Sequence, residues 1–122
     1  MSDEGKKISA TFFVTEQGNE PVREWLKEEL TTEQRKAVGT DMKTVEFGWP
    51  MGMPTVRKLE AELWEVRTRF QEGIARVVFS VADDKMVLLH GFIKKSQKTR
   101  SEDLETARKR LALYKAQQGA EQ

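Results

Sequence analysis

Two arginines in one predicted hairpin are the residues best placed to do chemistry. The segment Leu63–Arg69 is extended in character, Ile74–Val81 is a clear strand, and Gln71-Glu72-Gly73 is the turn between them. If the turn centres on Gln71 and Glu72, Arg67 faces Arg76 across the hairpin. Side chains in directly opposed positions start about 5 Å apart, so two like charges there are unfavourable unless an anion joins them. Phosphate is the natural candidate, because the planar fork of arginine binds it well.

Two other interpretations of this pair stay open. Glu65 could neutralise Arg67 diagonally, or the register of the hairpin could differ by one residue. A slip of one residue moves every side chain to the other face of the sheet, so the phosphate interpretation depends on the register.

A basic segment follows the last predicted strand. Residues Lys94-Lys-Ser-Gln-Lys-Thr-Arg100 carry four positive charges and no negative charge. Next to an arginine-bearing sheet, such a segment can make an electrostatic footprint for nucleic acid. The alternative is a solvated loop, which is the commoner fate of a short run of charge. Thr99 and Ser101 are interpreted as helix caps rather than catalytic residues.

His90 is the only histidine of the chain, and it could transfer protons near neutral pH. A lone histidine in an apolar strand such as Leu88–Phe92 is more often a hydrogen-bonded core residue. The chain has no cysteine, no His/Asp/Glu cluster with metal-ligand spacing and no glycine-rich phosphate loop. The sequence therefore predicts neither a metal nor a cofactor.

The elements that must position these residues belong to an α+β fold. Ile8–Val14 is predicted as a strand, Pro21 as the first turn of a helix, and Thr31 with Gln34 as the capping box of a second helix. The two helices are joined almost directly, which indicates an antiparallel pair. Gly48–Pro54 is a loop, because its two prolines and two glycines forbid regular structure.

Short turns between the later strands predict antiparallel neighbours, and a last helix is expected to begin near Thr99 or Ser101. The predicted order is β-α-α-β-β-β-α, with helices packed against a small antiparallel sheet. A length of 122 residues fits one domain, 1–122, with a core of about 8–115 and flexible tails, including Gln117–Gln122.

Charge and composition narrow the class of protein. Residues 1–62 hold 9 Lys/Arg and 12 Asp/Glu, whereas residues 63–122 hold 12 and 8. This asymmetry favours an anionic partner for the C-terminal half, although ordinary scatter of surface charge would give it too. Met1–Lys7 lacks the apolar stretch of a signal peptide, and no apolar run approaches the roughly 20 residues that span a bilayer. We expect a cytoplasmic protein without a membrane partner.

Four segments together carry a family resemblance. They are Arg57-Lys-Leu59, Leu63-Trp-Glu-Val-Arg67, Gly73-Ile-Ala-Arg-Val-Val-Phe79 and Leu88-Leu-His-Gly-Phe-Ile-Lys-Lys-Ser-Gln-Lys-Thr99. In this order and spacing, they resemble the HigB-like, phage-derived branch of the RelE/ParE toxin superfamily, from about Ile8 to Tyr114. Arg100 stands where this branch often has proline, which affects the start of the helix and leaves the basic residues in place.

The resemblance implies a RelE-like (microbial-RNase-like) fold and ribosome-dependent cleavage of mRNA, which inhibits translation. It also implies a cognate antitoxin, typically with a helix-turn-helix domain. By resemblance, Arg76 is the arginine that contacts the scissile phosphate in RelE-type enzymes, and Arg67 is the arginine of the family's Leu-Arg strand. The catalytic candidates are Arg67, Arg76, Lys94, Lys95 and His90, and the RNA-binding candidates are Phe92, Arg57, Lys58, Lys98 and Arg100.

The implied mechanism needs no metal: the RNA 2′-hydroxyl attacks its own adjacent phosphate. Lys94 or Lys95 would activate this nucleophile, with His90 as a second candidate. Adjacent strand residues point to opposite faces, so only one of the two lysines can share the face of the arginine pair. We favour Lys94, because Phe92 lies on the same face as Lys94. Two alternatives remain: a ParE-like DNA gyrase inhibitor that cuts no RNA, and an inactive prophage relic that only binds antitoxin.

Overall fold

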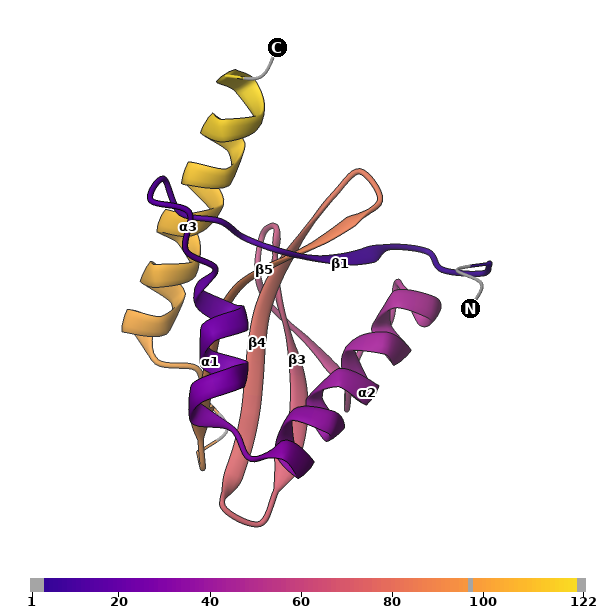
Figure 1. The fold of residues 1–122 in the computed structure, drawn as a ribbon. Helices are drawn as coiled ribbons and strands as arrows, with labels where there is room; N and C mark the ends of the chain where they lie inside the picture. Colours follow the sequence, from indigo (N-terminus) through magenta and orange to yellow (C-terminus); the bar gives the residue numbers. More distant parts are fainter. Residues whose placement is uncertain (1–3, 97, 121–122) are drawn as a thin grey trace.

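The computed structural model describes residues 4–96 and 98–120. Within these ranges the chain forms five strands and three helices in the order β1-α1-α2-β2-β3-β4-β5-α3 (Figure 1). The α+β class is confirmed, and the structure contains one strand more than predicted, β2. The outer ends of the predicted tails, residues 1–3 and 121–122, lie outside the described residues, as does Gln97 of the basic segment.

The sheet is mostly antiparallel, with one parallel edge. The strands are β1 (Ser9–Phe12), β2 (Val56–Glu60), β3 (Leu63–Phe70), β4 (Gly73–Ala82) and β5 (Lys85–Lys94). Their order in the sheet is β1-β5-β4-β3-β2. Strands β2 to β5 are antiparallel neighbours, whereas β1 pairs with β5 in parallel. The prediction of an antiparallel sheet was wrong for β1, because two helices separate β1 from the hairpins and no tight turn sets its direction.

The helical pair is held together at its junction. Helix α1 spans Pro21–Glu29 and α2 spans Thr32–Gly48. The predicted capping box is confirmed: the Thr31 hydroxyl accepts from the Gln34 backbone N–H, and the Gln34 side chain accepts from the Thr31 N–H. The Arg35 guanidinium donates to three carbonyls near the end of α1. These bonds satisfy polar backbone groups that a helix end leaves without partners.

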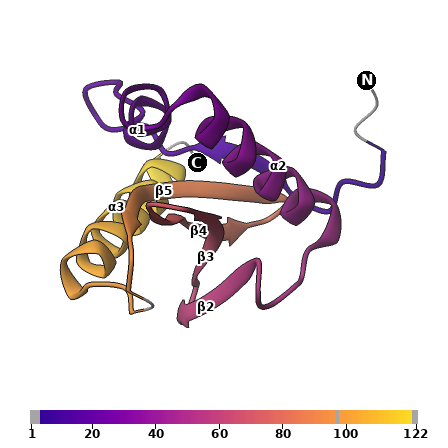
Figure 2. The ribbon, with the colours of Figure 1, turned by 90° about the horizontal axis from the view of Figure 1, so that it is seen from below.

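The helices form two layers on opposite faces of the sheet. Helices α1 and α2 cover one face, and α3 (Ser101–Ala120) covers the other (Figures 1 and 2). One apolar cluster joins the helical pair to the sheet through residues such as Val38 and Val77, and a second joins α3 to the sheet through Val78 and Leu111. Helix α3 continues to Ala120, so residues 117–120, predicted as a frayed tail, are helical. The Gln117 side chain donates to the Val14 carbonyl at 2.9 Å, which ties this end of α3 to the chain after β1.

The glycine of the Leu88-Leu-His-Gly-Phe92 segment lets α1 approach β5 closely. The Trp25 ring lies directly over Gly91, and a Cβ atom added at Gly91 would stand 2.4 Å from that ring. No real carbon approaches so closely, so any side chain at position 91 would push Trp25 and α1 away from the sheet.

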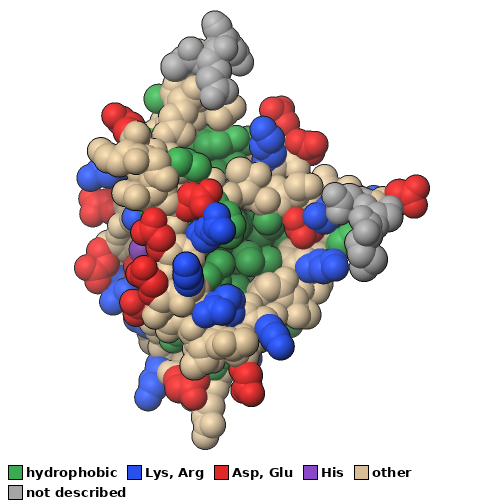
Figure 3. All heavy atoms as spheres, viewed as in Figure 1, with side chains coloured by type: hydrophobic (Ala, Val, Ile, Leu, Met, Phe, Trp, Pro, Cys, Tyr) green, Lys and Arg blue, Asp and Glu red, His purple; other side chains and the backbone are tan. Residues whose placement is uncertain are grey.

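Some apolar side chains remain at the surface on the face that carries the helical pair. Apolar side chains gather in the middle of this face, with Lys and Arg side chains beside them (Figure 3). Half-buried Phe12, Trp25 and Met42 belong to the cluster beneath the pair. None of the helices within residues 4–96 and 98–120 is long and apolar enough to cross a membrane.

Candidate active site: an arginine pair beneath the basic segment

The predicted hairpin register is confirmed. Arg67 pairs directly with Arg76 across β3 and β4, and Arg69 pairs with Ile74. The turn closes at Gly73, whose φ of 152° is a backbone conformation that favours glycine. Both arginines are buried, with 5% of Arg67 and 0% of Arg76 exposed. They share the α3 face of the sheet, because Val78, two residues beyond Arg76, belongs to the cluster beneath α3.

A buried carboxylate lies beside the pair. Glu65 is 0% exposed and accepts a hydrogen bond from an Arg67 terminal nitrogen at 2.8 Å. The interpretation that Glu65 neutralises Arg67 is therefore also confirmed, although the contact runs along one strand and not diagonally between strands. Burial lowers the pKa of Arg76 most, Glu65 and Asp103 raise it, and Arg67 and Arg57 lower it. The three arginines outnumber these two carboxylates, which leaves an excess of positive charge around Arg76.

The basic segment folds over the arginines. Arg76 donates to the Ser96 carbonyl and, at 3.4 Å, to the Thr99 hydroxyl. The Thr99 hydroxyl in turn donates to Glu65 at 2.9 Å. Thr99 is 6% exposed and bridges Glu65 and Arg76. The expectation that Thr99 and Ser101 cap the last helix was wrong, because α3 begins at Ser101 itself and its first N–H groups bond to the Arg100 carbonyl. Local sequence gave no sign of this bridge, since its partners lie 34 and 23 residues away.

Phe92 lies opposite Arg76 on β5 and is 6% exposed. The guanidinium carbons of Arg76 and Arg100 lie 5.8 and 5.7 Å from the centre of its ring. The His90 ring stacks on it as well, with ring centres 5.4 Å apart. The aromatic ring predicted to stack on an RNA base is thus covered by side chains of its own chain.

His90 is held through both ring nitrogens. Its Nε2 lies 2.7 Å from Asp103 and its Nδ1 lies 3.4 Å from a terminal nitrogen of Arg110. Burial lowers the pKa of His90 and the hydrogen bond to Asp103 raises it, with a net decrease. A neutral ring satisfies both contacts when Nε2–H donates to Asp103 and Nδ1 accepts from Arg110. Asp103 also accepts from Arg100 at 2.6 Å, which links His90 to the basic segment.

Asp103 and Arg110 were not predicted as part of this site. They are polar residues seven positions apart on α3, on the side that carries buried Ala107 and Leu111. Polar side chains on the apolar stripe of a helix need partners on the element that the stripe faces, and this signal could have found them.

The two predicted lysines, Lys94 and Lys95, have different surroundings in the structure. Lys94 lies opposite Ile74 on the face of Arg76 and Phe92, and its amino group donates to the Lys98 carbonyl at 2.9 Å. Lys95 is exposed and lines a shallow hollow of about 360 Å³ with Arg69 at the end of the β3–β4 hairpin. The expectation that Lys94 lies on the arginine face agrees with this placement, whereas Lys95 follows the end of β5 and has no register partner that assigns it to either face.

The two basic residues of β2 lie on opposite faces of the sheet. Arg57 lies opposite Glu65 and joins the arginine face. Lys58 lies opposite Trp64, and its amino group stands 5.4 Å from the centre of the Trp64 ring on the helical-pair side of the sheet. The structure therefore does not bring Lys58 to the arginine pair.

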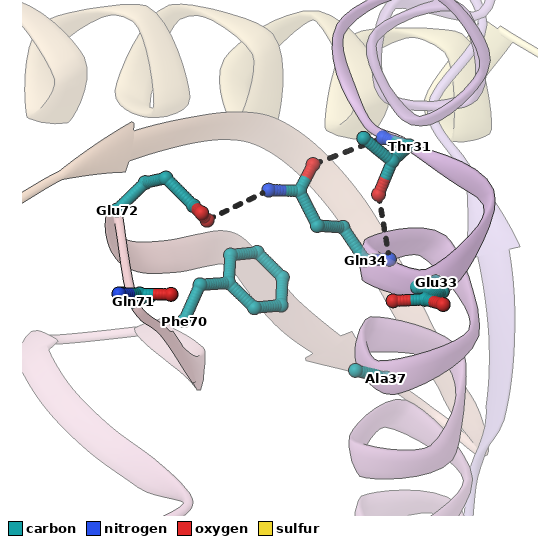
Figure 4. A pocket seen from close by; sticks show the side chains of 7 residues that line it. All are labelled: Thr31, Glu33, Gln34, Ala37, Phe70, Gln71 and Glu72. Carbon is teal, nitrogen blue, oxygen red and sulfur yellow. Dashed lines mark hydrogen bonds between the residues drawn. The ribbon is translucent and has the colours of Figure 1, made fainter.

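A separate hollow of about 410 Å³ lies between the start of α2 and the β3–β4 turn (Figure 4). Its lining residues are Thr31, Glu33, Gln34, Ala37, Phe70, Gln71 and Glu72. Gln34 donates to Glu72 at 3.2 Å, as drawn in Figure 4. This lining carries two carboxylates and no cation, so it would repel a phosphate. Among the described residues, no group of three or more His, Asp or Glu side chains is placed to hold a metal ion.

The comparison with protein families decides the membership of the chain. The sequence model of the family described as "Phage derived protein Gp49-like (DUF891)" matches residues 24–112. The chain belongs to this Gp49-like family. It is a RelE/ParE-like toxin family of toxin–antitoxin systems, and the α+β fold is consistent with a RelE-like one. The Gp49-like match spans every site residue from Arg57 to Arg110, whereas the comparison with curated proteins gave no match.

Proposed function

We propose that this Gp49-like protein is the HigB-like toxin of a type II toxin–antitoxin system and cleaves mRNA on the ribosome, which inhibits translation. The observation that supports this function best is the Arg67–Arg76 pair. Two opposed guanidinium groups on one sheet face, with Arg57 nearby and Glu65 as their counter-charge, concentrate positive charge of the kind that binds a phosphate group.

The proposed reaction is a transesterification within the RNA. The 2′-oxygen attacks the adjacent phosphorus, the bond from phosphorus to the 5′-oxygen breaks, and a 2′,3′-cyclic phosphate and a 5′-hydroxyl result. The proton that leaves the 2′-hydroxyl balances the proton that the 5′-oxygen gains, so no further reactant is consumed. Arg67 and Arg76 donate hydrogen bonds to the phosphate oxygens and stabilise the charge that develops on the phosphorane.

We assign activation of the 2′-hydroxyl and positioning of the site residues to different side chains. Lys94 lies on the arginine face and activates the 2′-hydroxyl through its positive charge. His90 has both ring nitrogens directed at side chains of its own chain, so we assign it a positioning role through Asp103 and Arg100. The scarcity of acid–base groups explains a dependence on the ribosome, which would supply the orientation of the mRNA.

The surrounding cations bind the flanking phosphates of the RNA. Arg57 on the arginine face and exposed Lys95, Lys98 and Arg100 around the basic segment supply this attraction, and Lys58 lies outside it. The remaining partner is a cognate antitoxin with a helix-turn-helix domain, which would neutralise the toxin.

The test adds purified protein to a translating extract that also contains supercoiled DNA and gyrase. The proposal predicts mRNA cut at ribosome-occupied positions and unaffected DNA. Intact mRNA with blocked gyrase would instead indicate a ParE-like inhibitor. Intact mRNA with active gyrase would indicate a relic whose remaining activity is antitoxin binding.

A further inference from the structure

We infer that Thr99 is a latch: its hydrogen bonds to Glu65 and Arg76 hold the basic segment closed over the arginine pair, and RNA binds only when this latch opens. This inference rests on the proposed function, because it concerns access of an RNA phosphate to the same arginines.

The closed state excludes phosphate from the site. Arg76 has no exposed surface, and Arg67 and Phe92 have almost none. The two terminal nitrogens of Arg76 donate to the Ser96 carbonyl and the Thr99 hydroxyl. A phosphate bound in the bidentate manner needs these donor atoms, so Ser96 and Thr99 must leave first.

The composition of the basic segment allows it to move away from the arginine pair. It contains no apolar residue, and Lys95, Ser96, Lys98 and Arg100 are all exposed. No hydrophobic burial holds it in place, so polar contacts carry the closure. Phosphate oxygens can replace the Ser96 and Thr99 oxygens on Arg76, and exposed Lys95 and Lys98 favour movement toward an RNA strand, whereas Lys94 stays in β5 and Arg100 is paired with Asp103.

Thr99 makes the contact that ties the segment to the arginine pair and its carboxylate. Among the described residues of the segment it is the buried one, and its hydroxyl bonds to a carboxylate that is itself fully buried. A hydrogen bond to a buried charge is worth more than a neutral one, because the charge loses water when the bond is absent. Loss of the Thr99 hydroxyl leaves that Glu65 oxygen without this donor in the closed state, whereas water reaches it in the open state. The variant Thr99→Val therefore shifts the equilibrium toward the open state.

The binding of a non-cleavable RNA measures this shift. The probe is a fluorescein-labelled, ten-nucleotide, fully 2′-O-methylated single strand, followed by anisotropy at one fixed salt concentration. When the closed state dominates, the apparent Kd is the intrinsic Kd divided by the open fraction. Loss of one charge-assisted bond changes that fraction by about tenfold, so Thr99→Val should bind the probe about tenfold more tightly. Its backbone amides at residues 95, 96, 98 and 99 should also exchange hydrogen faster in the free protein.

Two variants serve as controls. Thr99→Ser keeps the hydroxyl and should bind like the wild type. Thr106→Val removes a hydroxyl that bonds only within α3, to the Glu102 carbonyl, and should also bind like the wild type. If Thr99→Val does not fold, Thr99→Ala adds no bulk beside Glu65 and gives the same comparison. A folded Thr99→Val or Thr99→Ala protein with unchanged or weaker binding, and unchanged exchange at residues 95, 96, 98 and 99, overturns the latch.

Arg76→Ala separates the latch from the proposed function. If Arg76→Ala loses probe binding while Thr99→Val gains none, the arginine site stands and the latch is wrong. Because Arg76→Ala also removes two contacts of the closed state, the double variant Arg76→Ala/Thr99→Val is compared with Thr99→Val, and equal binding by these two would show that the phosphate site itself is wrong, and the latch with it.

Discussion

Arg67 and Arg76 occupy directly opposed positions on β3 and β4, and both guanidinium groups are buried on the α3 face of the sheet. Two like charges this close are costly in a protein interior. Glu65 offsets part of that cost through its 2.8 Å contact with Arg67, and carbonyl and hydroxyl oxygens of the basic segment accept from Arg76. The pair therefore carries some cost in stability, which agrees with the proposed role in binding an anion.

The first prediction concerns Arg76. In Arg76→Ala, one donor to the phosphorane is lost, and the rate of mRNA cleavage in a translating extract should fall by about 10²–10³-fold. Arg23→Ala, which removes an exposed arginine on α1, is the matched control and should cleave normally. Circular dichroism checks that both variants fold. Undiminished cleavage by a folded Arg76→Ala protein would remove Arg76 from the site.

The second prediction separates chemistry from attraction within the basic segment. Lys94 lies on the arginine face, so Lys94→Ala should lower the single-turnover cleavage rate on ribosomes even at saturating protein. Lys98 is exposed, so Lys98→Ala should leave that rate unchanged and weaken binding. The slope of log affinity against log salt should decrease in magnitude by about 0.7 in Lys98→Ala, because one phosphate contact is lost. Equal, modest binding losses with unchanged saturated rates would reduce Lys94 to a surface charge.

The third prediction concerns acid stability. Burial lowers the pKa of His90 in the folded protein, whereas an unfolded histidine titrates near about 6.5. Below about pH 7 the unfolded chain therefore binds more protons at His90 than the folded chain does. The free energy of unfolding should fall as the pH drops from about 7 to 5, by about 1.4 kcal/mol for each unit of difference between the two pKa values.

His90→Gln is the variant that isolates this effect. Glutamine can still donate to Asp103 but does not titrate, so the loss of stability between pH 7 and pH 5 should be smaller than in the wild type. Urea unfolding at the two pH values measures both slopes. An equally steep loss in His90→Gln would show that other groups cause the pH dependence.

The fourth prediction tests the contact between α1 and β5. Gly91→Ala places a methyl group where the Trp25 ring lies, so it should destabilise the fold by about 1–3 kcal/mol. Gly39→Ala is the matched control: it lies in α2 with no atom near the added Cβ, and it should stabilise by about 0.5–1 kcal/mol. Both values follow from urea unfolding at neutral pH, and equal effects of the two substitutions would contradict the close packing of Trp25 on Gly91.

The parts of this molecule that could be predicted from sequence are those set by local chemistry. A two-residue turn, Gln71-Glu72, followed by glycine sets the register that opposes Arg67 and Arg76, and Thr31 with Gln34 marks the start of α2. Strand β2 was missed, because it has five residues at a sheet edge directly after Met53-Pro54 and Thr55, where turn residues dominate the pattern.

The covering of the arginine pair could not be predicted, because it depends on contacts between distant parts of the chain. Thr99 meets Glu65 across 34 positions, and His90 meets Asp103 only after the chain reverses from β5 into α3. Periodicity indicates which face of a strand is buried, but it does not indicate which polar group will satisfy a buried arginine.

The chemistry of the cut ends tests the central claim most directly. Wild-type protein would be added to ribosomes stalled on a defined mRNA, and the ends of the fragments would be identified by mass spectrometry. The account predicts 2′,3′-cyclic phosphate and 5′-hydroxyl ends, and no cleavage when the nucleotide at the cut position carries a 2′-deoxy sugar. Fragments with 3′-hydroxyl and 5′-phosphate ends, or an mRNA that remains intact, would contradict it.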